Sequence, residues 1–295
     1  MDLNGYLESA REEILAQMRQ RVPSATTVPE SLHQAMNHAL FAGGKRLRPL
    51  LVLEACQLAG GNRSLAYDAA AAIECLHTFT LIHDDLPCMD DDDTRRGVPT
   101  CHVVYGEDIA LLAGDALMFT GMELLTRRDS RLDPSVQLEN ALAVARALGS
   151  RGVIAGQVLD LESEGRDPDP ELLREIHRHK TGALLEVSLE IGARAGGAEP
   201  ELMNRLKAYG RHFGLAFQIT DDILDVTGDS ARMGKATGRD AGLHKMTYPA
   251  LYGLEESRQL ARQEIRLALE ALEGLQGDNL WVFRTLAESL LERTV

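Results

Sequence analysis

Aromatic residues, positive charge and regular strand patterns are all scarce in this sequence. Phe, Trp and Tyr make up only 4% of the 295 residues, and no segment sustains the β-branched alternation that is typical of a half-buried strand. Lys and Arg number 31 against 45 Asp and Glu, which gives a net charge of −14 at pH 7. Because a phosphate backbone is bound by a basic surface, this balance argues against nucleic acid as a partner.

Long apolar runs and paired cysteines are also lacking. No segment approaches the ~18 uninterrupted apolar residues of a membrane span, and the first residues, MDLNGYLESAREEILAQMRQ, are charged where a secretory signal peptide is apolar. The four cysteines form no CxxC pair, which disfavours a zinc knuckle or a disulfide framework. We therefore expect a soluble protein with reduced thiols, located in the cytoplasm and without stable membrane insertion.

The apolar residues that are present follow a helical period. Leu7, Ile14 and Met18 recur at helical spacing, as do the apolar positions of AAAAIECLHTFTLIHDD and LLREIHRHKTGALLEVSLEIGA. Segments rich in Gly, Pro, Asp and Ser, such as RVPSATTVPES and EGRDPDPE, separate these runs. No change of composition marks a domain boundary. The sequence predicts an all-α fold, a helical bundle that forms a single domain over residues 1–295.

One short segment concentrates acidic charge. LIHDDLPCMDDDDTRRG, residues 81–97, places six aspartates between Asp84 and Asp93 and follows them with Arg95 and Arg96. A solvated acidic turn is the simplest interpretation of such a run on its own. We expect that interpretation for Asp91, Asp92 and Asp93.

A second acidic segment, FQITDDILDVTGD at 217–229, changes the interpretation of the first. Asp222 and Asp225 are three residues apart and Asp221 and Asp225 four apart, so on a helix they share one face. Such a face repels itself without a counterion, and carboxylates are hard oxygen ligands suited to Mg²⁺. Each acidic segment follows an apolar helical run, which indicates carboxylates at the mouth of a cavity in the bundle. The alternative is two unrelated acidic helix ends.

The basic residues gather in small groups beside turns. Cations in these places suit a polyanionic ligand, because arginine can bind phosphate oxygens through two nitrogens, although each group alone is compatible with a solvated surface. AGGKR is not a nucleotide-binding P-loop, since no Ser or Thr follows the lysine and Ala39 occupies the place of the first glycine. The groups are Lys45, Arg46 and Arg48 in GGKRLRP, then Arg95 and Arg96, Lys180 in HRHKTGA, and Lys235 and Lys245.

These motifs, taken in order, resemble those of the trans-prenyltransferases that build isoprenoid diphosphates, especially the farnesyl and geranylgeranyl diphosphate synthases of bacteria and plastids. The resemblance runs from about residue 32 to the C-terminal helix and includes LAGDAL, AGQVLDL, HKTGALL and KMTYPAL besides the acidic segments. It implies a homodimeric helical bundle around a deep apolar pocket, with Mg²⁺ at its mouth. The substrates would be isopentenyl diphosphate and an allylic diphosphate.

The resemblance also implies a role for individual residues. The metal would be held by Asp84, Asp90 and Asp221, with Asp85, Asp222 and Asp225 as further ligands or water-mediated support. The allylic diphosphate would be bound by Arg95, Lys180, Lys235 and Lys245. Isopentenyl diphosphate would bind without metal at Gly44, Lys45, Arg48, His77 and Arg96. Thr181 and Gln218 match positions whose oxygens lie close to the carbocation, and Arg293 is a further candidate that helps to close the isopentenyl site.

Product length in such enzymes depends on how far the growing chain descends before it meets a bulky group. Thr80 lies one turn before Asp84, and Phe79 is next to it, so both are predicted to project into the pocket. An aromatic residue here resembles the farnesyl enzymes, which predicts (2E,6E)-farnesyl diphosphate as the main product. The alternative is geranylgeranyl diphosphate, because DLPCMD and YGEDIALLAGDAL resemble the plastid and cyanobacterial geranylgeranyl synthases.

Two other functions are compatible with part of the pattern. A terpene cyclase shares the ionisation chemistry but has no use for a second diphosphate site, so Lys45, Arg48 and Arg96 count against it. A non-catalytic partner subunit usually lacks one aspartate motif, whereas both are present here.

Overall fold

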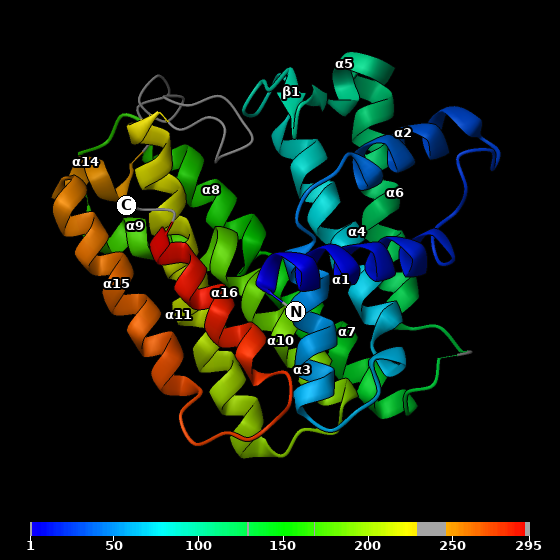
Figure 1. The fold of residues 1–295 in the computed structure, drawn as a ribbon. Helices are drawn as coiled ribbons and strands as arrows, with labels where there is room; N and C mark the ends of the chain where they lie inside the picture. Colours follow the sequence, from blue (N-terminus) through cyan, green and yellow to red (C-terminus); the bar gives the residue numbers. More distant parts are fainter. Residues whose placement is uncertain (1, 129, 168, 229–245, 293–295) are drawn as a thin grey trace.

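The computed structural model describes residues 2–128, 130–167, 169–228 and 246–292, which form helices and one small hairpin (Figure 1). The α-helices are α1 (Leu3–Arg19), α2 (Glu30–Phe41), α3 (Leu47–Leu58), α4 (Tyr67–Asp84), α5 (Cys101–Tyr105), α6 (Glu107–Leu125), α7 (Pro134–Leu148), α8 (Val153–Ser163), α9 (Pro170–His177), α10 (Ala183–Ala195), α11 (Pro200–Thr227), α14 (Tyr248–Tyr252), α15 (Leu254–Ala271) and α16 (Leu280–Glu292). The other elements are the 3₁₀ turn η1 (Arg63–Leu65), the π-helical turn η2 (Arg178–Gly182) and the strands β1 (Thr94–Arg95) and β2 (Val98–Pro99).

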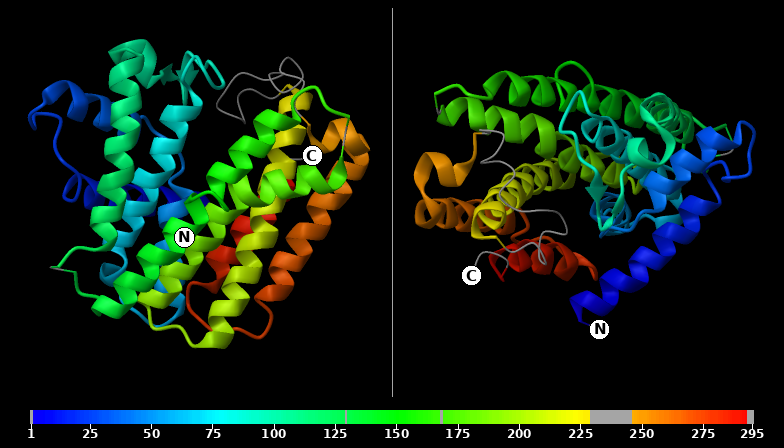
Figure 2. Two further views of the ribbon diagram at one scale, coloured as in Figure 1. Left: turned by 180° about the vertical axis from the view of Figure 1, so that it is seen from behind. Right: turned by 90° about the horizontal axis from the view of Figure 1, so that it is seen from above.

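The long helices pack along one another as a bundle. Helix α4 lies against α6, α11 lies against α15, and α10 contacts α3, α7 and α11. Figures 1 and 2 show that α1 crosses the outside of this bundle, while α4 and α11 both end at the same end of the molecule, with the β1–β2 hairpin beside the end of α4. The predicted all-α helical bundle is confirmed.

Helix α4 forms much of the core because most of its sides are apolar. Its buried residues include a run of alanines from Ala69 to Ala72 and the larger Ile73, Leu76 and Ile82. A helix that is apolar around most of its circumference is buried among other helices. The close approach of α6 requires Gly121, since a Cβ there would lie 2.5 Å from Cγ of Leu76. The acidic residues that follow α4 are thus carried on a rigid, buried support.

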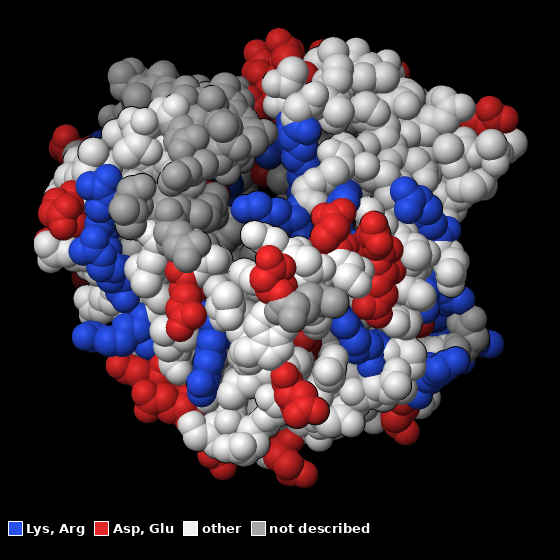
Figure 3. Space-filling model, viewed as in Figure 1, with Lys and Arg blue, Asp and Glu red and all other residues white. Residues whose placement is uncertain are grey.

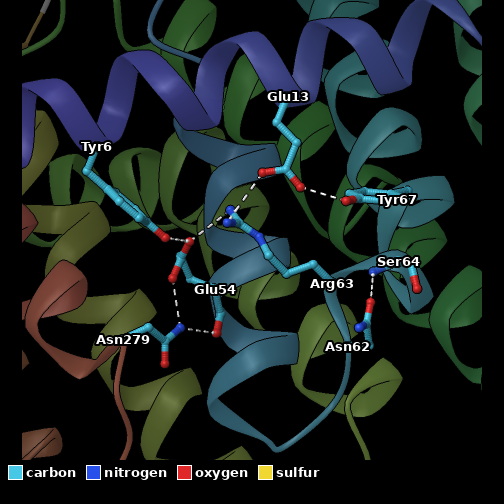
Figure 4. Close-up of polar contacts among 8 residues, drawn as sticks. All are labelled: Tyr6, Glu13, Glu54, Asn62, Arg63, Ser64, Tyr67 and Asn279. Atoms are coloured by element: carbon cyan, nitrogen blue, oxygen red, sulfur yellow. Dashed lines mark hydrogen bonds and ion pairs between the residues drawn. The ribbon is translucent and has the colours of Figure 1, made fainter.

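A buried polar cluster joins the two ends of the chain (Figure 4). Glu54 of α3 is fully buried, and its carboxylate accepts hydrogen bonds from the Tyr6 hydroxyl at 2.6 Å, from Arg63 at 3.0 Å and from the Asn279 amide at 2.7 Å. Tyr6 belongs to α1, and Asn279 directly precedes α16. Removing one partner of a buried ion pair typically costs about 3–5 kcal/mol, because the other charge is left uncompensated. This cluster fixes α1 and α16 against α3.

The small hairpin was not expected from the sequence. Thr94 pairs with Pro99 and Arg95 with Val98 in antiparallel register. The two residues between the strands, Arg96 and Gly97, have φ angles of 55° and 79°. Two successive residues with positive φ are the signature of a type I′ turn, which connects twisted antiparallel strands. The pair is too short to show the alternation by which a strand is recognised in a sequence.

The structure also describes the cysteines and the lengths of the apolar helices. All four cysteines are free: Cys56, Cys75 and Cys101 are buried, and Cys88 is exposed. Within the described ranges, no helix is both long enough and apolar enough to cross a membrane.

Candidate functional site: two acidic helix ends and a cluster of arginines

The two acidic segments lie at the ends of α4 and α11. Asp84 is the last residue of α4, and the amide of Asp90 donates to the Asp84 carbonyl at 2.8 Å, so the intervening turn folds back on the helix end. Asp221, Asp222 and Asp225 all lie within α11, as their spacing predicted. Figure 1 shows the two helix ends at the same end of the molecule, and the negative charge of Asp221 opposes the lowering of the Arg48 pKa by burial.

The Asp85 carboxylate forms an ion pair with an arginine. Nε of Arg95 donates to Oδ1 of Asp85 at 2.6 Å, and NH2 of Arg95 lies 3.3 Å from Oδ2 of Asp92. Burial raises the pKa of Asp85 to about 6, against the opposing effect of Arg95. Asp92 is only 6% exposed, so the expectation of a solvated run is wrong for this residue, whereas Asp91 and Asp93 are exposed. Asp85 and Asp92 together orient the Arg95 guanidinium.

Asp222 is also held by protein groups. Its Oδ1 accepts from the Gln218 side-chain amide at 3.0 Å, and its Oδ2 accepts from the Tyr248 backbone amide at 3.0 Å. Nε2 of His177 lies 3.3 Å from the same Oδ2, and the His177 ring stacks on that of Tyr248. His177 ends α9 and Tyr248 begins α14, so one buried carboxylate connects three helices. The sequence indicated a structural or supporting role for His177, whereas Tyr248 was not singled out.

Thr181 and Gln218, which the sequence predicted to act together, are in contact. The Thr181 hydroxyl donates to Oε1 of Gln218 at 2.8 Å. Thr181 and Lys180 lie in the π-helical turn η2, and such wide turns are frequent at functional sites. Nζ of Lys180 is 2.6 Å from Oδ2 of Asp160, which lies on α8 in the AGQVLDL motif and was not assigned a role from the sequence.

Arg48, His77 and Arg96, predicted to share one anion site, lie close together. NH1 of Arg48 is 3.0 Å from Nε2 of His77, and NH1 of Arg96 donates to the Gly43 carbonyl at 3.0 Å. Burial, followed by the charges of Arg48 and Arg96, lowers the pKa of His77 well below its ordinary value. The imidazole is therefore neutral at pH 7, and its Nε2 accepts the hydrogen bond from Arg48.

One hydrogen-bond donor of this cluster has no partner among the described residues. Nε of Arg48 is buried and has no acceptor among the described residues. A buried donor of this kind is normally satisfied, so an anion oxygen is a suitable partner. Figure 3 shows Lys and Arg side chains around a hollow in the upper part of the view. Lys45, at the turn before α3, is exposed.

Arg46 differs from its neighbours in the sequence. It is 2% exposed, and its NH1 lies 2.5 Å from Oε1 of the buried Glu74 on α4. Arg46 therefore belongs to the interior and does not face a ligand. Glu74 was missed in the sequence because nothing in an apolar helical run distinguishes a paired buried glutamate from a solvated one.

The two predicted chain-length residues lie on different sides of α4. Thr80 lies on the same face of α4 as His77 and Asp84. Its hydroxyl donates a hydrogen bond to the His77 carbonyl at 2.8 Å. Phe79 is buried, and its ring centroid is 5.8 Å from that of His83, whose Nε2 contacts the Leu111 carbonyl of α6. Phe79 thus faces toward α6.

The acidic residues suit a metal ion that is coordinated by both the protein and a bound ligand. Within the part of the chain that the structure describes, no three His, Cys, Asp or Glu side chains form a metal cage by themselves. Oxygen donors from two separate helix ends fit Mg²⁺, which usually takes one or two carboxylates and completes its coordination with water and substrate phosphates. Lys235, Lys245 and Arg293 lie outside the described residues.

Comparisons with known proteins agree on one family. The family model for polyprenyl synthetase matches residues 29–278. Geranylgeranyl pyrophosphate synthase 11, chloroplastic, of Arabidopsis thaliana is 45% identical over 281 residues, covering 94% of this chain and 78% of the relative. Geranylgeranyl pyrophosphate synthase, chloroplastic, of Capsicum annuum is 47% identical over 247 residues, covering 83% and 67%. A crystal structure of an FPP/GFPP synthase from Zymomonas mobilis superposes with a TM-score of 0.87 at 36% identity, covering 98% of both chains.

The geometry around Gly44 gives a direct test of the arginine cluster. A Cβ on Gly44 would lie 2.6 Å from Cζ of Arg96, whereas a Cβ on Gly43 would meet nothing within 4 Å, although both glycines have positive φ. We expect Gly44→Ala to displace Arg96 and weaken the binding of inorganic diphosphate in EDTA by about tenfold to a hundredfold, the usual value of a charged hydrogen bond. Calorimetry measures this affinity. Gly43→Ala is the matched control for backbone strain, and equal losses in both variants would contradict the prediction.

Proposed function

Because the chain belongs to the polyprenyl synthetase family and is a trans-prenyltransferase, we propose that it condenses isopentenyl diphosphate head-to-tail with allylic diphosphates to make geranylgeranyl diphosphate. The observation that supports two diphosphate substrates is the presence of two chemically different groups of side chains, the aspartates at the ends of α4 and α11 and the cluster of Arg48, His77 and Arg96. The names of similar relatives favour the geranylgeranyl product over the farnesyl product predicted from Phe79. The reaction is assigned to one polyprenyl synthetase domain over residues 1–295.

The allylic diphosphate is proposed to bind between the ends of α4 and α11. Asp84, Asp90 and Asp221 would hold Mg²⁺, which supplies charge stabilisation for the leaving diphosphate. Asp85, Asp222 and Asp225 would support this set as further ligands, through water, or by orienting neighbours, since Asp85 already orients Arg95. Arg95 and Lys180 would bind the diphosphate oxygens, together with Lys235 and Lys245.

Isopentenyl diphosphate is proposed to bind at the arginine cluster. Arg48 and Arg96 supply charge, His77 and Lys45 line the same site, and Gly44 allows the chain to pass close to Arg96. A guanidinium binds phosphate oxygens without a metal because it offers several donors in one plane. Arg95 donates a hydrogen bond to Asp85, whereas Arg96 donates to the Gly43 carbonyl. The two successive arginines therefore bind two different substrates in this proposal.

The chemistry requires charge stabilisation and exclusion of water. As the allylic C–O bond breaks, Arg95 and Lys180 stabilise the growing negative charge on the leaving diphosphate. The oxygens of Thr181 and Gln218 lie close to the carbocation, and the hydrogen bond between them fixes their orientation. The alkene of isopentenyl diphosphate attacks the cation, and the released diphosphate removes the proton. Water must be excluded, since it would quench the cation.

The other functions considered explain fewer of these contacts. A terpene cyclase has no second diphosphate for Arg48 and Arg96 to bind. A non-catalytic subunit has no need of the Thr181–Gln218 pair or of both aspartate segments. A relative in Arabidopsis thaliana, 44% identical over 297 residues, is named a heterodimeric geranylgeranyl pyrophosphate synthase large subunit, so assembly with a second chain type is an alternative to self-association.

Self-association is proposed through an apolar face. Residues Phe119 and Leu112 of α6 are 69% and 53% exposed, and Ile154 and Val158 of α8 are also exposed. Helix α7, which lies against both α6 and α8, adds exposed Leu138. Figure 2 shows α6 and α8, apart from each other, on the side seen from behind. Large apolar patches of this kind usually mark interfaces, so we propose a homodimer formed by this face.

A reducing compartment is proposed as the place of action. All four cysteines are free thiols, which is typical of reducing compartments such as the cytoplasm. The names of the plant relatives place those proteins in chloroplasts.

The activity is tested with purified protein, Mg²⁺ and radiolabelled isopentenyl diphosphate, supplied in parallel with dimethylallyl, geranyl or farnesyl diphosphate. We expect EDTA-sensitive incorporation that ends at geranylgeranyl diphosphate, resolved by chain length. Accumulation of farnesyl diphosphate would overturn the product assignment and restore the farnesyl prediction. Absence of EDTA-sensitive incorporation would overturn the prenyltransferase proposal itself.

Thr80 provides a test of the path of the chain. We propose that the tail descends along the His77–Thr80–Asp84 face of α4, and that Phe79 belongs to the wall on the α6 side. Thr80→Phe should then shift the main product from geranylgeranyl to farnesyl diphosphate, because the added ring occupies this path. Phe79→Ala, measured alongside, is the control and should leave the product length unchanged, because the Phe79 side chain is directed toward α6. Unchanged product length in both variants would show that the tail follows another path.

Phe119 provides a test of the proposed dimer. Phe119→Glu should convert the protein to a monomer, because a charge at the centre of an apolar interface is costly to bury. Light scattering during size-exclusion chromatography gives the mass. Val28→Glu is the matched control, since Val28 is 82% exposed in the segment between α1 and α2. A wild-type monomer would contradict the homodimer and favour a different partner chain.

A further inference from the structure

The arginine cluster brings like charges together in a partly buried place. Burial lowers the pKa of Arg48 to about 10 and also lowers the pKa of Arg96, and other arginines add to the lowering for Arg96. For both residues, the strongest opposing effect is the negative charge of Glu74. One buried carboxylate is therefore the shared counter-charge of the cluster.

Glu74 lies one turn before His77 on α4 and is 1% exposed. Its partner Arg46 is equally buried, with NH1 at 2.5 Å from Oε1 of Glu74 and NH2 donating to the Leu40 carbonyl at 2.8 Å. These contacts attach the end of α2 and the start of α3 to α4. Neither residue belongs to the set that the resemblance assigns to isopentenyl diphosphate, although the sequence grouped Arg46 with the cations suited to a polyanion.

Arg46 also determines the shape of the turn that precedes it. It has φ 53°, in the left-handed region that is unusual for a residue with a side chain, and it directly precedes the first residue of α3. The contact with Glu74 holds it there. Gly43 and Gly44 lie immediately upstream, and Arg96 both donates to the Gly43 carbonyl and packs against Gly44. Arg96 thus contacts the turn that leads into Arg46.

We propose that Glu74, acting through Arg46, is the positioning residue of the isopentenyl diphosphate site. Its carboxylate fixes the left-handed turn at Arg46, and its charge keeps Arg48 and Arg96 beside each other before the substrate arrives. The proposal rests on the proposed function, since it assigns the arginine cluster to isopentenyl diphosphate. Glu74 touches no substrate and has no direct role at the allylic site.

The first test is Glu74→Gln, assayed with each substrate varied in turn. We expect the KM for isopentenyl diphosphate to rise at least tenfold, while the KM for the allylic diphosphate changes less than twofold. Glu54→Gln is the matched control, because Glu54 is an equally buried glutamate bound to an arginine in another part of the bundle (Figure 4). It should lower the melting temperature without this selective change. Equal changes in the KM of both substrates, or the same change in both variants, would overturn the proposal.

Glu74→Gln leaves Arg46 buried without its counter-charge, so it can also lower the stability of the fold. A second variant is therefore needed to separate the effect on positioning from the effect on stability. The double variant Arg46→Met/Glu74→Leu replaces the pair with apolar groups, which often preserves stability. We expect its melting temperature to be close to that of the wild type while the KM for isopentenyl diphosphate remains at least tenfold raised. If stability and this KM both return to wild-type values, the pair serves only the fold and the proposal fails.

A binding measurement keeps the proposal separate from the assigned activity. Calorimetry with isopentenyl diphosphate in EDTA measures the arginine cluster without turnover, and we expect at least tenfold weaker binding by the double variant. Wild-type protein that binds isopentenyl diphosphate but makes no product would refute the proposed function and leave this inference standing. Wild-type protein that is active while the double variant binds equally well would refute the inference alone.

Discussion

The pairing of two buried carboxylates, one within α4 and one directly after its last residue, with arginines from other segments organises the candidate site. Glu74 binds Arg46, and Asp85 binds Arg95, eleven residues and about three helical turns further on. His77, between them, accepts from Arg48. Because α4 is buried along its length, these contacts are anchored in the core, and they determine where the cations of two different segments lie.

Helix α11 contributes to the site in the same way from the other side. Asp222 joins the end of α9 and the start of α14 to α11, and through Gln218 it also orients Thr181. Both aspartate segments therefore contain a buried carboxylate that binds protein groups. Asp85 and Asp222 bind protein groups, so adjacent members of one acidic motif are distinguished by their partners.

The sequence predicted the elements of this site better than the contacts between them. The spacing of Asp221, Asp222 and Asp225 correctly placed them on one helix, because helical period is a local property. The burial of Asp92 and Arg46 was not predicted, since it depends on Arg95 and Glu74, whose positions are set by the packing of α2, α3 and α4. The charge of a side chain can be read from the sequence. Its solvent exposure cannot, because it depends on residues that are distant along the chain. The predicted farnesyl product relied on the size of Phe79, but its side chain is directed toward α6.

The free cysteines have a practical consequence. Cys88 is exposed in the turn between Asp84 and Asp90, whereas Cys56, Cys75 and Cys101 are buried, and burial raises the pKa of each of these three thiols. Thiol reagents react with accessible thiolates, so a fluorescent maleimide should attach selectively at Cys88. The native protein thus offers a single labelling position within the acidic turn. A dye placed there would report occupancy of the neighbouring carboxylates by its emission, with no engineered attachment point.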